Sequence, residues 1–256
     1  MGARIVTFAN QKGGVGKTTT AVSLSVALGR RGQRVLLVDL DPQANATSAV
    51  GFQPDEATGT YDAILGEIPI ADCISPVENE YLHLVPSHTA LAGAEVELVP
   101  AMARERKLSA ALADARNDYV WILIDCPPSL GLLTINALTA SDFVIVPVQC
   151  EYMALEGLSH LMETLNLVRD NLNTSLNILG VVLTMYDGRT RLSQQVADEV
   201  RDHIETTFNT IIPRAVRLSE APSHGMSIFR YDPGGRSAIA YDNLAAEVLE
   251  RAGVAV

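Results

Sequence analysis

Seven residues near the start of the chain have the types and the order needed to hold phosphate groups. Residues 12–18 read Lys-Gly-Gly-Val-Gly-Lys-Thr, and they follow an apolar run, residues 4–9, that predicts a β-strand. Glycines let successive backbone N–H groups turn toward phosphate oxygens, and the N-terminus of a following helix adds partial positive charge. Lys17 would reach the β- and γ-phosphates of a nucleotide, and the Thr18 hydroxyl would bind Mg²⁺. The predicted contacts to ATP or ADP are Lys12, Gly13, Gly14, Val15, Gly16, Lys17, Thr18 and Thr19.

Carboxylates at the ends of two further apolar runs complete this predicted site. Asp39 and Asp41 follow residues 34–38 and would point the same way if the strand continues, and Asp125 ends the run 120–124. A carboxylate beyond a strand end binds a magnesium-bound water or positions the attacking water. We therefore predict that Asp125 holds Mg²⁺ with Thr18, and that Asp39 supports either the magnesium shell or the loop.

Strand-like and helical patterns alternate along the rest of the chain. This alternation predicts an α/β fold with a mostly parallel twisted sheet and helices on both faces, in which ligands lie beyond the carboxyl ends of the strands. We expect one domain over residues 1–256. The predicted strands are residues 4–9, 34–38, 82–86, 120–124, 143–148 and 178–185, and the predicted helices are residues 16–31, 104–117, 155–171, 193–206 and 237–252.

The composition indicates in which compartment the protein works and whether it binds membranes or nucleic acid. No charged stretch leads into an apolar run before the first strand, and the longest apolar runs are too short to span a bilayer, so we expect a cytoplasmic protein. The net charge of −11 disfavours nucleic acid at first sight. Residues 185–236, however, carry as many basic as acidic groups, and every basic group there is an arginine.

The phosphate loop departs from the general GxxxxGK[ST] pattern in an informative way. Gln11 stands where the pattern has its first glycine, and an additional lysine, Lys12, begins the loop. The segment resembles the deviant Walker A motif of the ParA/MinD group of P-loop ATPases. The resemblance implies that Lys12 reaches across a dimer interface to the phosphates of the other subunit, and that Asp41 serves hydrolysis. With Lys17, these two residues form the predicted catalytic set.

Later segments resemble the short ParA/Soj-type chromosome-partitioning ATPases. The resembling segments are residues 127–137, 147–157, 185–191 and 213–222. The resemblance implies an ATP-sandwich homodimer that binds double-stranded DNA without sequence preference near the nucleoid. It also implies release when a ParB-like centromere-binding protein stimulates slow ATP hydrolysis. Pro213 lies where this family contacts adenine, although Ala215 replaces a frequent asparagine two residues on.

Arginines late in the chain are the predicted DNA contacts. Non-specific binding needs only several cations that meet the phosphate backbone. We predict this role for Arg189, Arg191, Arg214 and Arg217. The alternative is that they are ordinary surface arginines, or ion-pair partners of Asp187 and Glu220.

Three other functions fit the same fold. A MinD-like membrane-cycling ATPase would need a basic amphipathic helix at the C-terminus, whereas residues 245–256 are acidic with one arginine. A carrier like the nitrogenase iron protein would need paired cysteines between subunits, and Cys73, Cys126 and Cys150 show no CxxC spacing. A small-molecule ligase or kinase would need an acceptor pocket that no motif indicates.

Overall fold

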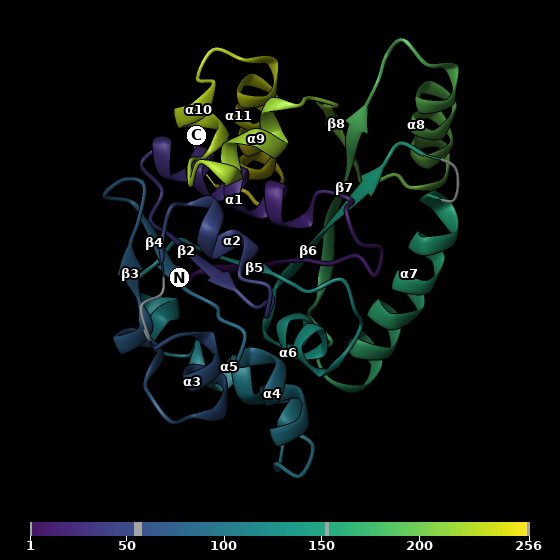
Figure 1. The fold of residues 1–256 in the computed structure, drawn as a ribbon. Coiled ribbons are helices and arrows are strands. Elements are labelled where there is room, and N and C mark those ends of the chain that lie inside the picture. The colour runs from purple at the N-terminus through teal and green to yellow at the C-terminus, as the bar shows by residue number, and fades with distance from the viewer. Residues whose placement is uncertain (1, 54–57, 152–153, 255–256) are drawn as a thin grey trace.

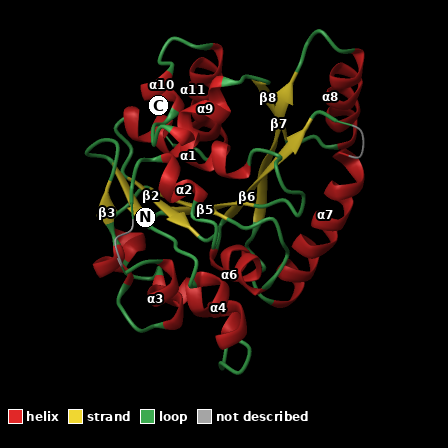
Figure 2. Ribbon diagram, in the orientation of Figure 1, coloured by secondary structure: helices red, strands yellow, loops and turns green. Residues whose placement is uncertain are grey.

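Eight strands of the described residues form one sheet, and helices cover both of its faces (Figures 1 and 2). The computed structural model describes residues 2–53, 58–151 and 154–254. The strand order is β3-β4-β2-β5-β1-β6-β7-β8, and β3 is antiparallel to β4 while the other neighbours are parallel. The strands are β1 (Arg4–Phe8), β2 (Val35–Asp39), β3 (Ser75–Pro76), β4 (Leu82–Val85), β5 (Trp121–Asp125), β6 (Phe143–Gln149), β7 (Asn177–Tyr186) and β8 (Thr207–Pro213). The predicted fold class is confirmed.

The helices connect these strands, and four of them match predicted helical segments. The α-helices are α1 (Lys17–Arg30), α2 (Asn45–Ala49), α3 (Thr60–Leu65), α4 (Leu91–Glu97), α5 (Lys107–Ala111), α6 (Leu132–Ala140), α7 (Ala154–Asn171), α8 (Arg191–His203), α9 (Arg217–Ser223), α10 (Ile228–Tyr231) and α11 (Arg236–Arg251). Of these, α1, α7, α8 and α11 match four of the five predicted helical segments. Short 3-10 turns are η1 (Ile70–Cys73), η2 (Arg104–Arg106) and η3 (Ala115–Asn117). Residues 152–153 of the resembling segment 147–157, and residues 1, 54–57 and 255–256 of the predicted domain, lie outside the described residues.

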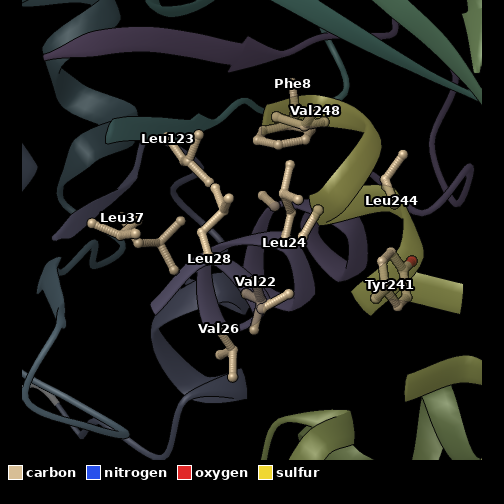
Figure 3. Packing of buried hydrophobic residues seen from close by; sticks show 14 of the residues in the cluster. Phe8, Val22, Leu24, Val26, Leu28, Leu37, Leu123, Tyr241, Leu244 and Val248 are labelled. Atoms are coloured by element: carbon tan, nitrogen blue, oxygen red, sulfur yellow. The ribbon is translucent and has the colours of Figure 1, made fainter. Parts of the chain in front are cut away.

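Both faces of the sheet are buried, which explains why its strands are apolar at nearly every position. On one face α1 packs over β1, β2 and β5, and α11 packs beside it over β8, with Leu24 and Leu28 of α1 among Phe8, Leu123 and Val248 (Figure 3). The other face is covered by α3, α5 and α6 over β2 and β5, and by α7 and α8 over β6 and β7. This packing holds the carboxyl ends of β1, β2 and β5 at one edge.

The single helix predicted over residues 104–117 is wrong. The segment breaks into η2, α5 and η3. Its helical spacing is real, because Leu108 and Leu112 are both fully buried. The Asn136 side chain of α6, however, accepts the Leu108 N–H at 3.1 Å and donates to the Arg104 carbonyl at 2.8 Å. Tertiary hydrogen bonds therefore replace the helical ladder at the start of the segment.

Candidate nucleotide-hydrolysis site

The phosphate loop lies between β1 and α1 and is fixed from two neighbouring strands. Gly14 and Gly16 have φ angles of 73° and 87°, in the left-handed region that favours glycine. Asn10 donates to the Pro147 carbonyl at 2.8 Å and accepts the Lys12 N–H at 3.0 Å. Thr184 of β7 donates to the Val15 carbonyl at 2.8 Å. These bonds shape the loop before any nucleotide binds.

The two lysines of the loop lie in different environments. Lys17 is buried, and its Nζ donates to the Lys12 carbonyl at 3.1 Å. Burial lowers the pKa of Lys17, while Asp125, Cys126 and Asp41 act in the opposite direction. The Lys12 side chain is exposed. Lys12 thus binds Asn10 and Lys17 through its backbone N–H and carbonyl, while its side chain is exposed to solvent.

Asp39 and Asp125 end adjacent strands in register, and both are fully buried. Asp39 Oδ2 accepts the hydroxyl and the N–H of Thr47 at 2.7 and 2.8 Å, and its Oδ1 accepts the Asp41 N–H at 3.1 Å. Burial raises the pKa of Asp39 to about 6, and these hydrogen bonds oppose the rise. Both oxygens of Asp39 are therefore engaged in holding the loop that follows β2.

Asp125 has no such support among the described residues. Neither of its oxygens has a hydrogen-bond partner of regular geometry, although the Thr18 hydroxyl lies close enough to affect its pKa. Burial, and then the Asp39 charge, raise the pKa of Asp125 well above its usual range, while Thr18 and Lys17 partly offset this. A buried carboxylate with free oxygens beside a hydroxyl is a donor set that fits Mg²⁺.

Asp41 is held at the cavity wall by its own turn. Its Oδ1 accepts the Gln43 N–H at 2.9 Å, and its carbonyl accepts the Ser87 hydroxyl at 2.7 Å. The next residues lead into α2 through Ala44, whose φ angle of 52° is left-handed. Asp41 faces the same cavity as Lys17 and Thr18, so the structure brings these three predicted residues together.

Two adjoining cavities extend from the phosphate loop. The larger, about 560 Å³, is lined by Gly13, Lys17, Thr18, Asp41 and residues of α2, α9 and α10. The smaller, about 350 Å³, is lined by Thr19, Pro213, Val216 and Tyr241. Both are lined by Met185, whose φ angle of 52° is unusual for a residue other than glycine. The predicted adenine contact, Pro213, thus lies on a cavity that continues from the loop.

The predicted DNA-contact arginines lie at the end of the sheet where β7 and β8 finish. Arg189 pairs with Asp187 through two bonds of 2.9 and 2.7 Å, and this contact lowers the pKa of Asp187 to about 2. Arg214 also lowers the pKa of Asp187, so these two arginines flank one carboxylate. Arg217 lies 3.5 Å from Asp232, and Arg191 is exposed at the start of α8.

Sequence reasoning missed the residues that support this site. Thr47, Ser87 and Thr60 are fully buried and connect the ends of β2 and β4. Asn10 and Thr184 fix the phosphate loop. Asn10, Ser87 and Thr184 lie directly after a predicted strand or at its end, whereas nothing in the sequence marks Thr47 and Thr60, which lie on α2 and α3. Single hydroxyl and amide residues at such positions are too common to single out.

The sheet order, the glycine loop with its lysine, and the carboxylates on two adjacent strands define a P-loop ATPase of the deviant Walker A type. The model of an AAA domain family matches residues 3–178. The sporulation initiation inhibitor protein Soj of Bacillus subtilis is 54% identical over 247 residues, covering 96% of this chain and 98% of Soj. The chain belongs to the ParA/Soj family of chromosome-partitioning ATPases.

A second relative agrees with this assignment, and a solved structure shares the fold. The chromosome partitioning protein ParA of Myxococcus xanthus is 49% identical over 250 residues, covering 97% of this chain and 88% of that protein. A cobyrinic acid a,c-diamide synthase from Mycobacterium smegmatis, solved with ADP and magnesium, superimposes with a TM-score of 0.86. It is 38% identical, and the alignment covers 98% of this chain and 96% of that one.

Three features bear on the alternative functions. The three cysteines are free and buried. No helix in the described part of the chain is both long enough and apolar enough to cross a membrane. The apolar face of α11, which includes Tyr241, Leu244 and Val248, is buried with the core around α1 (Figure 3).

Proposed function

We propose that this chain is a DNA-segregation ATPase that switches between DNA-bound and free states as it binds and hydrolyses ATP. It is an ATP hydrolase of the ParA/Soj family, and its substrate is ATP with Mg²⁺. The observation that carries the proposal is the combination of a preformed phosphate loop with an exposed Lys12 at its head. The loop supplies one half of a nucleotide site, and Lys12 is free to supply the other half to a second copy.

Each residue of the site has a proposed part in hydrolysis. Gly13, Gly14, Gly16 and the start of α1 bind the phosphates through backbone N–H groups. Lys17 neutralises charge on the β- and γ-phosphates. Bound Mg²⁺, held by Thr18 and Asp125, would neutralise charge on the β- and γ-phosphates during transfer. Asp41 positions the attacking water, and Asp39 keeps the Asp41 turn in place.

A homodimer is the proposed ATP-bound form, and the exposed position of Lys12 supports it. Two copies that face each other across their phosphate loops would each place Lys12 near the other's γ-phosphate, where a second cation stabilises the developing charge. The dimer would double the arginines available to DNA, because Arg189, Arg191, Arg214 and Arg217 come from both copies. Since non-specific affinity rises with the number of phosphates neutralised, ATP-dependent pairing would switch DNA binding on.

A ParB-like centromere-binding protein is the proposed partner that stimulates hydrolysis, and the nucleoid is the proposed place of action. Both proposals rest on the resemblance to Soj and ParA. The M. smegmatis synthase shares the nucleotide-binding fold, but the partition proteins are more similar to this chain in sequence.

The deciding experiment measures molecular size and DNA retention with ATP, ADP or no nucleotide. We expect dimers and retained DNA with ATP only, and weaker retention as salt is raised. Asp41→Ala should leave dimers trapped on DNA, because ATP binds but is not hydrolysed. Monomers in every nucleotide condition, or DNA binding that is flat across salt, would refute the proposal.

A further inference from the structure

Three buried hydroxyl groups connect the loop that follows β2 to the end of β4. This loop, residues 40–44, carries Asp41, and we call it the acidic turn. Thr47, Thr60 and Ser87 are each 0% exposed. They lie far apart in sequence, on α2, on α3 and in the loop that follows β4. Buried hydroxyls are costly unless hydrogen-bonded, and each of these three donates a bond to Asp39 or Asp41. The Thr60 hydroxyl also lies 3.2 Å from the Pro86 carbonyl.

The connections form a continuous chain. Ser87 donates its hydroxyl to the Asp41 carbonyl at 2.7 Å, and its N–H donates to the Thr47 hydroxyl at 3.0 Å. Thr47 in turn donates that hydroxyl to Asp39 Oδ2 at 2.7 Å. Thr60 donates to the Asp39 carbonyl at 2.7 Å. Asp39 Oδ1 accepts the Asp41 N–H, so the main chain of Asp41 is held on both sides.

The direction of these bonds fixes where the Asp41 side chain lies. Its N–H is held by Asp39, its carbonyl accepts the Ser87 hydroxyl and also the Ala44 N–H at 2.9 Å, and Oδ1 accepts the Gln43 N–H. The Asp41 side chain lines the phosphate cavity together with Lys17 and Thr18. A shift of about 1 Å in a positioned group costs as much as 100-fold in rate.

We infer that Ser87 and Thr47 are positioning residues for hydrolysis, which act through Asp41 by fixing its backbone beside the phosphate cavity. The inference rests on the proposed role of Asp41. Neither residue lines either cavity. They should therefore affect the rate of the hydrolytic step and leave the binding of ATP largely unchanged.

The test uses substitutions that remove one hydroxyl at a time from the full chain. Ser87→Ala removes the bond to the Asp41 carbonyl and keeps the N–H bond to Thr47. Thr47→Val keeps the shape of the side chain and removes its hydroxyl, while Thr47→Ser restores it. Ser25→Ala is the matched control, because Ser25 is equally buried but bonds only to Ala21 of its own helix.

The readouts are basal ATP hydrolysis without DNA, as kcat and KM separately, and the melting temperature. We expect Ser87→Ala and Thr47→Val to lower kcat by about tenfold with KM changed less than about twofold. Thr47→Ser and Ser25→Ala should keep kcat near that of the parent. In an Asp41→Ala background, the residual hydrolysis is measured in single-turnover experiments, and neither Ser87→Ala nor Thr47→Val should lower its rate further, because they act through the missing carboxylate.

The outcomes separate this inference from the proposed function. If Asp41→Ala lowers hydrolysis to a residual rate while folded Ser87→Ala and Thr47→Val keep the parent kcat, the positioning role is wrong and the proposed function stands. If the substitutions lower kcat further in the Asp41→Ala background, they act by another route and the inference also fails. If Asp41→Ala keeps the parent kcat, the inference and the proposed role of Asp41 fail together.

Discussion

Asp39 and Asp125 lie opposite each other on adjacent parallel strands, fully buried, yet only Asp39 has its oxygens hydrogen-bonded among the described residues. Two carboxylates with nearly the same burial thus have opposite energetic roles. The bonds to Asp39 hold the acidic turn together. The unpaired Asp125 is unfavourable in the nucleotide-free chain, and this cost is relieved when a cation binds there.

Alanine substitution should separate these two roles. Asp39→Ala leaves the two Thr47 donors and the Asp41 N–H without their acceptor, so we expect a loss of about 1–3 kcal/mol in the free energy of unfolding. Asp125→Ala removes a buried carboxyl group whose oxygens lack hydrogen-bond partners, so the nucleotide-free variant should melt at or above the parent temperature. Thermal melts without nucleotide, and with MgATP, check this. Asp125→Ala should also lose the stabilisation that MgATP gives the parent, and an equal loss of stability in both variants would contradict the division of roles.

The raised pKa of Asp39 predicts how stability changes with pH. Its pKa is about 6 in the folded chain, against an ordinary 3.8. Between these values the folded chain holds a proton that the unfolded chain has released, so stability falls as pH rises through this window. In Asp39→Asn this part of the fall should be absent. Urea unfolding of parent and variant from pH 4 to 7 measures the difference, and parallel pH profiles would show that Asp39 titrates normally.

Much of the site was predictable because its residues follow strands directly. The glycine loop after β1 and the carboxylates at the ends of β2 and β5 combine an apolar run with residues of specific chemistry. Strand β8 was missed because Asn209 and Thr210 interrupt its apolar pattern. Their N–H groups are bound by the Glu247 carboxylate of α11, at 2.8 and 3.0 Å. No local pattern reveals such a partner, which lies 38 and 37 residues away.

Lys12→Ala should separate ATP binding from pairing. The Lys17 Nζ bonds to the Lys12 carbonyl, which alanine retains, so the loop should keep its shape and its affinity for ATP. The missing ammonium group should abolish ATP-dependent dimers and DNA retention. Lys107→Ala, which removes a lysine elsewhere, is the control. Light scattering and nucleotide titration check the prediction, and normal dimers of Lys12→Ala would exclude the contact across the interface.

The Asp187 carboxylate should weaken DNA binding. Its carboxylate neutralises Arg189 through two bonds and lies near Arg214. Asp187→Asn should therefore raise DNA affinity in ATP, and Arg189→Ala should lower it and reduce the salt slope by about 1 per lost phosphate contact. Arg106→Ala is the control, because Arg106 lies outside residues 185–236, and it should change neither the DNA affinity nor the salt slope. DNA titrations at several salt concentrations measure this, and equal affinity of Asp187→Asn and the parent would show that the ion pair does not limit binding.

The backbone of Gly51, which follows α2, contacts the backbone of Gly225, which follows α9. We call this contact the glycine crossing; it connects the segment after Asp41 to α9, which lines the larger cavity. A Cβ on Gly51 would lie 2.6 Å from the Gly225 carbonyl oxygen, and Gly51 has a φ angle of 76°. Gly32 has nearly the same φ, 75°, with nothing within 4 Å of an added Cβ. Gly32→Ala should cost about 1–2 kcal/mol in the free energy of unfolding, from backbone strain alone.

Gly51→Ala should lower the free energy of unfolding by about 1–3 kcal/mol more than Gly32→Ala does. It has the same backbone strain, and its added Cβ also overpacks against Gly225. It should also weaken ATP binding, since α9 must move away from the cavity that its residues line. Gly32→Ala should leave ATP binding unchanged. Chemical unfolding and nucleotide titration of both variants give the comparison. If Gly51→Ala and Gly32→Ala lose the same stability and bind ATP equally well, the glycine crossing does not determine the position of α9 beside the cavity.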